Sequence, residues 1–206
     1  MRISNGLSMP VSHVSLDLFP KDHVIPGWAR TLSKGGTVAQ EHIDASPENL
    51  AHLRDAGIDR LCVHTRDPRQ ATLSWVHHVE STTGENKNLR QLISPPIPDR
   101  YDALEFSEKI DWQIEHHLPL LIEWTRAWVA AADDHDTGID IHFTAHEDLR
   151  TDDEGFFKGI LDVFEVPLEK FNFKFLAISD QRLHRRKGES DEWRSVFSAE
   201  QDKAAT

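Results

Sequence analysis

The feature that most constrains the fold is an alternation of short apolar runs with helical segments that begin at a capped proline. The segment 46–57 opens with Ser-Pro and closes at glycine, an order typical of a helix with an N-cap, a first-turn proline and a glycine stop. The segment 59–65, with Leu61, Cys62 and Val63 at its centre, follows and is predicted to be a buried strand. Asp67 and Pro68 then repeat the cap-and-proline signal, which predicts a second helix.

The rest of the chain extends this pattern. Strands are predicted at 11–19, 37–43 and within 138–149, and helices at 25–36, 103–132 and 151–167. Pro119 should kink or break the long helical region, and Thr151 is the expected cap of the last helix. The proline-rich stretch 86–100 predicts a loop. Strands that alternate with helices indicate an α/β domain with a mainly parallel sheet flanked by helices.

Composition excludes several classes of protein. The 206 residues can form one domain, and the formal net charge of -12 disfavours nonspecific binding to nucleic acid or to an anionic membrane. The single cysteine, Cys62, rules out an internal disulfide and a multi-cysteine metal site, which suits the cytoplasm. No apolar run approaches the roughly 20 residues of a membrane span, and the start lacks the build of a signal peptide. We expect a single domain over 1–206 with a flexible tail at 199–206.

The residue just after the strand 59–65 carries the first functional signal. In α/β folds ligands collect at the carboxyl ends of strands, and Arg66 stands at such a position. A phosphate there would meet the N–H groups at the start of the next helix, the Arg66 guanidinium and the hydroxyl of Ser74. The alternative is that Arg66 and Arg69 pair with Asp67 and neighbouring carboxylates.

A second signal lies near the carboxyl end of the chain. The run 182–187 holds three arginines and one lysine in an otherwise acidic protein, and Gly188 follows it directly. A basic cluster that ends in glycine can wrap a phosphate, because glycine lets the backbone approach, and burial of Trp193 would hold such a loop in place. A solvated run of charge is the alternative.

The two segments together resemble the sulfotransferase family that uses 3'-phosphoadenylyl sulfate (PAPS) as donor. In that family an Arg-Asp/Asn-Pro turn after a strand, with a serine eight positions beyond the arginine, holds the 3'-phosphate. Arg66, Asp67, Pro68 and Ser74 match this element in type and spacing.

The family completes the same phosphate site with a later Arg-Lys-Gly loop that a tryptophan follows closely. Arg186, Lys187, Gly188 and Trp193 match that loop, and the order of the two elements agrees. The family also has an aromatic-Glu-Asp-Leu stretch after a strand, which resembles residues 146–149.

The resemblance implies a catalytic residue as well. The family's general base is a histidine at the end of a strand, a little over twenty residues before the phosphate-binding arginine. His42 lies 24 residues before Arg66 and is the candidate base. An unperturbed imidazole is largely neutral at physiological pH, as a base must be.

Three departures from the family pattern stand out. Asp191 replaces a frequent second glycine, and His146 replaces a common tyrosine. The stretch 1–36 lacks the family's Ser-Gly-Thr-rich phosphosulfate loop, since Lys21 and Lys34 have no Ser/Thr setting around them. We therefore expect a sulfotransferase fold, P-loop-NTPase-like in architecture, that lacks the first strand-loop-helix. Either the chain is truncated, or another basic residue substitutes for the loop, or the protein has lost catalysis; an unrelated fold is the remaining alternative.

The implied function is transfer of a sulfuryl group from PAPS to a hydroxyl or amine of a small-molecule or carbohydrate acceptor, without a metal. The alternative is a non-catalytic nucleotide-binding or partner-binding remnant of the same fold. A nucleoside-triphosphate kinase or hydrolase is disfavoured because no Walker motif is present. We read the histidine pairs 77–78 and 116–117 as surface residues, Cys62 as an inert buried thiol and His64 as a packed neighbour of Arg66.

Overall fold

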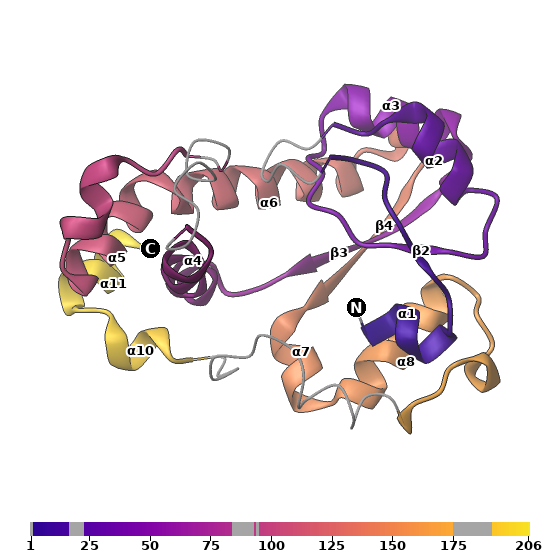
Figure 1. Ribbon diagram of the computed structural model, residues 1–206. Helices are drawn as coiled ribbons and strands as arrows, with labels where there is room; N and C mark the ends of the chain where they lie inside the picture. The colour runs from indigo at the N-terminus through magenta and orange to yellow at the C-terminus, as the bar shows by residue number, and fades with distance from the viewer. Residues whose placement is uncertain (1, 17–22, 84–92, 94, 175–190) are drawn as a thin grey trace.

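The computed structural model describes residues 2–16, 23–83, 93, 95–174 and 191–206 as a mixed α/β protein (Figure 1). The order of elements is α1 (Arg2–Leu7), β1 (Val11–Ser12), α2 (Pro26–Leu32), β2 (Val38–Ala39), α3 (Pro47–Asp55), β3 (Arg60–Thr65), α4 (Pro68–Thr83), η2 (Asp99–Ala103), α5 (Phe106–His116), α6 (Leu118–Asp133), η3 (His135–Thr137), β4 (Asp140–Ala145), α7 (His146–Thr151), α8 (Asp153–Val163), η4 (Leu168–Lys170), α10 (Trp193–Val196) and α11 (Ala199–Ala204). Within this part of the chain no helix is long and apolar enough to cross a membrane.

The pair β3–β4 lies at the centre of the fold. The strands are parallel and stay in register from Arg60 opposite Asp140 to Thr65 opposite Ala145. In Figure 1 they cross the middle of the molecule, with α4, α5 and α6 toward one side and α7 and α8 beyond the end of β4. Because the strands are parallel, both carboxyl ends emerge at one edge, where α4 and α7 begin.

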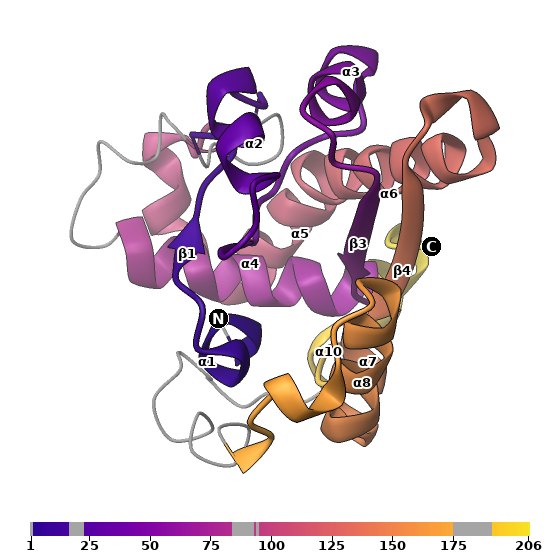
Figure 2. The ribbon, with the colours of Figure 1, turned by 90° about the vertical axis from the view of Figure 1, so that its right-hand side faces the viewer.

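A second parallel pair joins β1 to β2, with α2 between them in the chain. In the described residues this pair does not join β3–β4, so the single sheet that we expected is divided into two sheets (Figure 2). Each strand of the β1–β2 pair has only two residues, which limits it to a short ladder. The strand β1 and the helix α2 that precede β2 lie within the strand predicted at 11–19 and the helix predicted at 25–36.

Helix α3 begins as the sequence predicts. The Ser46 side chain caps it by accepting a hydrogen bond from the Asn49 N–H, at 3.3 Å, with proline in the first turn. Gly57 follows with φ of 82°, a left-handed conformation that favours glycine at a helix end. Leu50 and Leu53 bury one face of α3 in a core that also contains Val63 of β3.

The long helical region 103–132 is two helices rather than one. Helix α5 ends at His116, and α6 starts at Leu118 with proline in its first turn. These helices and α4 pack around the apolar cluster of Leu73, Val76, Ile110, Ile114, Leu118 and Trp193. His117, at the break, is only 3 % exposed, so the prediction that it is a surface residue was wrong.

Two local predictions need correction. The strand 59–65 is only partly buried, since Val63 is its one buried residue and Cys62 is intermediate. Helix α8 is capped by Asp152, whose carboxylate accepts from the Gly155 N–H at 2.8 Å, and not by Thr151. Thr151 instead ends α7, because the chain turns helical directly after β4.

The tail 199–206, expected to be flexible, contains the docked helix α11. Ser198 and Gln201 form a capping box at its start. The Gln201 side chain is 5 % exposed and donates to Asp111 Oδ1 on α5, at 2.7 Å, and to Ser107. The apolar and hydrogen-bonded contacts of the tail were not visible in its polar sequence.

Gln201→Ala should lower the free energy of unfolding by about 1–3 kcal/mol, because it leaves the Asp111 carboxylate and the Ser198 N–H without this partner. Urea denaturation followed by circular dichroism measures this change. Lys203→Ala, on the exposed side of the same helix, is the control and should change little. Equal stability of the two variants would show that α11 does not dock through Gln201.

Candidate functional site

The edge where β3 and β4 end gathers polar side chains from both strands. The His64 Nδ1 and Thr144 Oγ1 atoms are 3.0 Å apart, and the Thr65 hydroxyl donates to the Thr144 carbonyl at 3.2 Å. The Asp67 N–H donates to Glu147 Oε1 at 3.1 Å. These hydrogen bonds connect the carboxyl ends of β3 and β4. Arg66 directly follows β3, and His146 directly follows β4.

Two histidine rings face each other at this edge. The centroids of His64 and His146 are 6.1 Å apart in an edge-on arrangement, and Phe156 of α8 packs edge-on against His64 at 5.5 Å. His64 keeps part of its ring open to solvent, whereas His146 is half-buried. The Nε2 atom of His146 is buried and has no hydrogen-bond partner among the described residues.

The electrostatics keep both rings neutral at physiological pH. Burial lowers the pKa of His146 to about 4, and the positive charges of Arg66 and Arg150 add to this effect, while Glu147 opposes it. Burial also lowers the pKa of His64, where the charge of Glu147 acts against the charge of Arg66. The permanent positive charge of this edge is therefore that of arginine.

The start of α4 is occupied by Asp67. Its Oδ1 atom accepts from the Arg69 N–H at 2.9 Å and from Arg69 Nε at 3.1 Å, and its Oδ2 atom accepts from Arg69 at 2.8 Å. Burial would raise the pKa of Asp67, but the hydrogen bonds and charge of Arg69 outweigh it and hold the pKa below its usual value. Arg69 is thus paired structurally, as the alternative interpretation expected, and this N–H is not available to a phosphate.

Trp193 docks on the same helix start. It is 2 % exposed, the Arg69 guanidinium lies 3.8 Å from the centre of its ring, and the backbone N–H of Trp193 donates to Gln70 Oε1 at 3.2 Å. The predicted burial of Trp193 is confirmed. Arg186, Lys187 and Gly188 lie outside the described residues, but Trp193 follows Gly188 by five positions in the sequence. The chain that continues from the basic loop is therefore anchored on α4.

Ser74 and His42 occupy different elements. Ser74 is half-buried in the second turn of α4, on the helix that Arg66 precedes. His42 is exposed in the connection between β2 and α3, not at the end of a strand. Its neighbours are well anchored, since Glu41 accepts from the Val14 N–H at 3.1 Å and the Ile43 carbonyl accepts from the Trp124 indole at 2.8 Å. The structure thus groups Arg66, Ser74 and Trp193 around α4 and leaves His42 on a separate segment.

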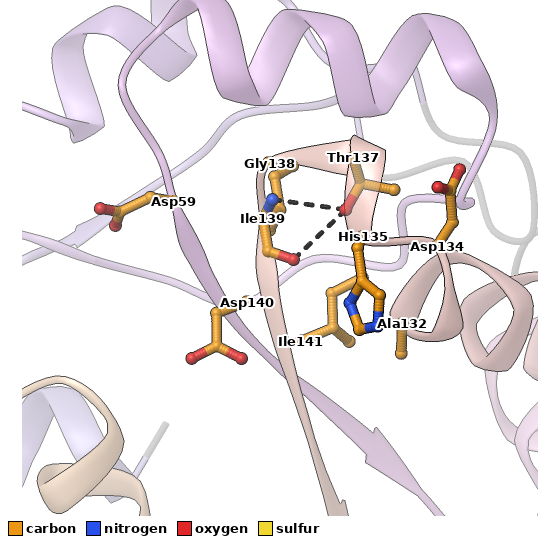
Figure 3. A pocket seen from close by; sticks show the side chains of 9 residues that line it. All are labelled: Asp59, Ala132, Asp134, His135, Thr137, Gly138, Ile139, Asp140 and Ile141. Carbon is orange, nitrogen blue, oxygen red and sulfur yellow. Dashed lines mark hydrogen bonds between the residues drawn. The ribbon is translucent and has the colours of Figure 1, made fainter.

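An open pocket lies at the other end of the central strands (Figure 3). It is lined by Asp59, Ala132, Asp134, His135, Thr137, Gly138, Ile139, Asp140 and Ile141. The carboxylates of Asp59, Asp134 and Asp140 do not converge on one point in this view. Across the part of the chain that the structure describes, no group of three or more His, Cys, Asp or Glu residues could hold a metal ion. Since parallel sheets bind ligands at the carboxyl ends of their strands, this pocket is not the candidate site.

Comparisons with protein-family models, with curated proteins and with solved structures found no match.

Sequence reasoning did not identify the histidine pair as part of the site. His64 was read as a packed neighbour of Arg66, and His146 only as a replacement for tyrosine. The two residues are far apart in the sequence and meet because of the register of β3 with β4. No local pattern encodes that register, although the position of His64 near the end of the predicted strand 59–65 was a usable signal.

His146→Gln should reduce the acid sensitivity of the fold. Between pH 6.5, the ordinary pKa, and about 4, the unfolded chain binds a proton at His146 that the folded chain does not. The contribution of His146 to the free energy of unfolding is therefore fully present above pH 6.5 and is lost as the pH falls toward 4.

Urea unfolding at about pH 7 and about pH 5 measures this effect. The wild type should lose more stability between the two pH values than His146→Gln does. His135→Gln, at an exposed position in η3, should behave as the wild type. The same loss in all three proteins would contradict a neutral, half-buried His146.

Proposed function

We propose that this protein binds the 3'-phosphate of PAPS at the start of α4 and transfers the sulfuryl group of that donor to a hydroxyl or amine. One observation carries the proposal. The two sequence elements that resemble the sulfotransferase family are more than a hundred residues apart, and Trp193, which belongs to the second, packs on Arg69 and Gln70, next to the first. Convergence of the two elements is what a shared phosphate site requires.

Phosphate recognition would rest on side chains. Asp67 accepts a hydrogen bond from the Arg69 N–H. Fewer N–H groups are therefore available to a phosphate at the start of α4 than the sequence suggested. Arg66 supplies a planar guanidinium with several donors, and Ser74 supplies a hydroxyl from the next turn. The resemblance adds Arg186, Lys187 and Gly188 to this set.

Catalysis would use His42 as the base that deprotonates the acceptor as it attacks sulfur. The leaving phosphate oxygen gains negative charge and needs a cation or N–H groups beside it. In the family a strand, a turn and a helix near the start of the chain supply them. Here the described chain has a short strand, β1, and a helix, α2, in this region, but its sequence lacks the family's Ser-Gly-Thr turn.

The second candidate is a non-catalytic nucleotide-binding protein of the same fold. One observation favours it over an enzyme. The Ser-Gly-Thr turn that would stabilise the leaving group is missing from the sequence. Both candidates require the same phosphate site, and only the first requires sulfuryl transfer. One experiment therefore tests binding and a second tests catalysis.

The binding experiment is a calorimetric titration of the 206-residue chain with adenosine 3',5'-bisphosphate. The wild type should bind with micromolar affinity, and Arg66→Ala should bind about 10–100-fold more weakly, because a charge-assisted hydrogen bond contributes roughly 1.5–3 kcal/mol. Arg126→Ala, an exposed position on α6, is the charge-matched control and should bind as the wild type. A folded wild type that does not bind would contradict both candidates.

The catalytic experiment measures transfer from labelled PAPS to a panel of hydroxyl and amine acceptors. His42→Ala should reduce the turnover number by about 10²–10⁴-fold, as expected for loss of a general base, while bisphosphate affinity stays unchanged. His135→Ala is the control. Bisphosphate binding without transfer to any acceptor would favour the non-catalytic candidate.

A further inference from the structure

We propose that His64 and His146 complete the anion site beside Arg66, and that they take up protons when a dianionic group such as sulfate or a phosphate ester binds there. This inference rests on the proposed function in that the donor's 3'-phosphate would be the anion. It goes further by adding two residues that the resemblance does not supply and by making affinity depend on pH.

The position of the pair carries the first step. His64 is the second-to-last residue of β3, and His146 is the first residue after β4. Parallel pairing places both at the edge of the sheet where ligands bind, with ring centroids 6.1 Å apart. An oxygen-rich anion beside the rings would lie near both of them and near Arg66, whose charge already acts on each.

The state of the rings carries the second step. His64 is accessible from solvent, so a ligand can reach it. The Nε2 atom of His146 is buried and has no hydrogen-bond partner among the described residues, which is a cost that rotation of the protonated ring toward an anion oxygen would remove. Once protonated, the His146 ring can therefore donate a hydrogen bond from Nε2.

The surrounding charges carry the third step. Among the described residues, the charged groups that act on His146 are Arg66, Arg150 and Glu147, besides the His64 ring itself. Arg66 and Glu147 also act on His64. Glu147 is held by the Asp67 N–H, and its single charge does not keep either histidine protonated. A dianion would add two negative charges at this edge. These charges would raise the pKa of both rings and favour the imidazolium form.

A purely structural role for the rings makes a different prediction. If His64 and His146 only pack against each other and Phe156, a bound anion would leave their pKa values unchanged or would bind elsewhere. Proton uptake on anion binding therefore separates a ligand-binding pair from a packing pair. It also needs no catalytic activity to be observed.

The test uses inorganic sulfate, which stays a dianion across the pH range of the measurement, so that any proton taken up belongs to the protein. Histidine ring resonances of the ¹⁵N-labelled full chain are followed from about pH 8 to about pH 6, which stays above the pI of about 5.5. Sodium chloride at matched ionic strength is the reference. We expect the His146 ring to stay neutral over this range in sodium chloride and to titrate with a pKa above about 6 in sulfate, and we expect sulfate to bind more tightly at the lower pH.

Variants assign the effect to the pair. The double variant His64→Gln, His146→Gln should lose the extra sulfate affinity at low pH, whereas His135→Gln should keep it. The comparison also removes the general increase in anion binding that comes from the other histidines. If the double variant does not fold, the wild-type ring titration alone decides the question.

The outcomes are distinct from those of the proposed function. Sulfate that shifts neither ring, while adenosine 3',5'-bisphosphate still binds, would overturn the inference and leave the proposed function intact. A sulfate-induced shift of His146 without bisphosphate binding would support the anion site and remove the nucleotide from the proposal. A wild type that gives no shift with sulfate and no bisphosphate binding would overturn both.

Discussion

The parallel pairing of β3 with β4 is the interaction on which the candidate site depends. Its register brings Arg60 opposite Asp140 at one end and Thr65 opposite Ala145 at the other. As a result, the chain leaves both strands at one edge and enters α4 and α7 there. A slip of one residue would turn the side chains of one strand to the opposite face and would separate His64 from Thr144. The hydrogen bonds at the strand ends therefore fix the register and the site together.

The start of α4 serves two purposes that compete. Asp67 stabilises the helix by accepting the Arg69 N–H, and it also pairs with the Arg69 guanidinium that covers Trp193. One carboxylate thus links the helix cap to the docking of the C-terminal segment. The same carboxylate places negative charge where an anionic ligand would come. In the proposed function, affinity for an anion must therefore come from other side chains at the strand ends, above all Arg66.

The charge distribution explains why the site must be local. With a net charge of -12 the chain repels anions at long range, and screening confines attraction to about 8–10 Å at physiological ionic strength. Arginine remains charged in such surroundings, whereas burial keeps His146 neutral. If the two histidines take up protons when an anion binds, as we propose, the positive charge at this edge increases on binding, which would favour dianions over monoanions.

The sequence by itself determined the local structure of this protein. Ser46 with Pro47, and Asp67 with Pro68, predicted where α3 and α4 begin, because a capping side chain and a first-turn proline act within a few residues. The strand that became β3 and the break beside Pro119 follow from equally local physics. The burial of Trp193 was also predictable, since a tryptophan beside a basic run has few other ways to remove its surface from water.

Only the tertiary structure decided which distant residues meet. The register of β3 with β4 brought His64 to His146, and the docking of α10 brought Trp193 to Arg69, because both depend on long-range packing that no short pattern encodes. The same reason explains the division of the strands into two sheets and the docking of α11 through Gln201. Local chemistry thus set where elements start and stop, and the summed packing of many weak contacts set which of them became neighbours.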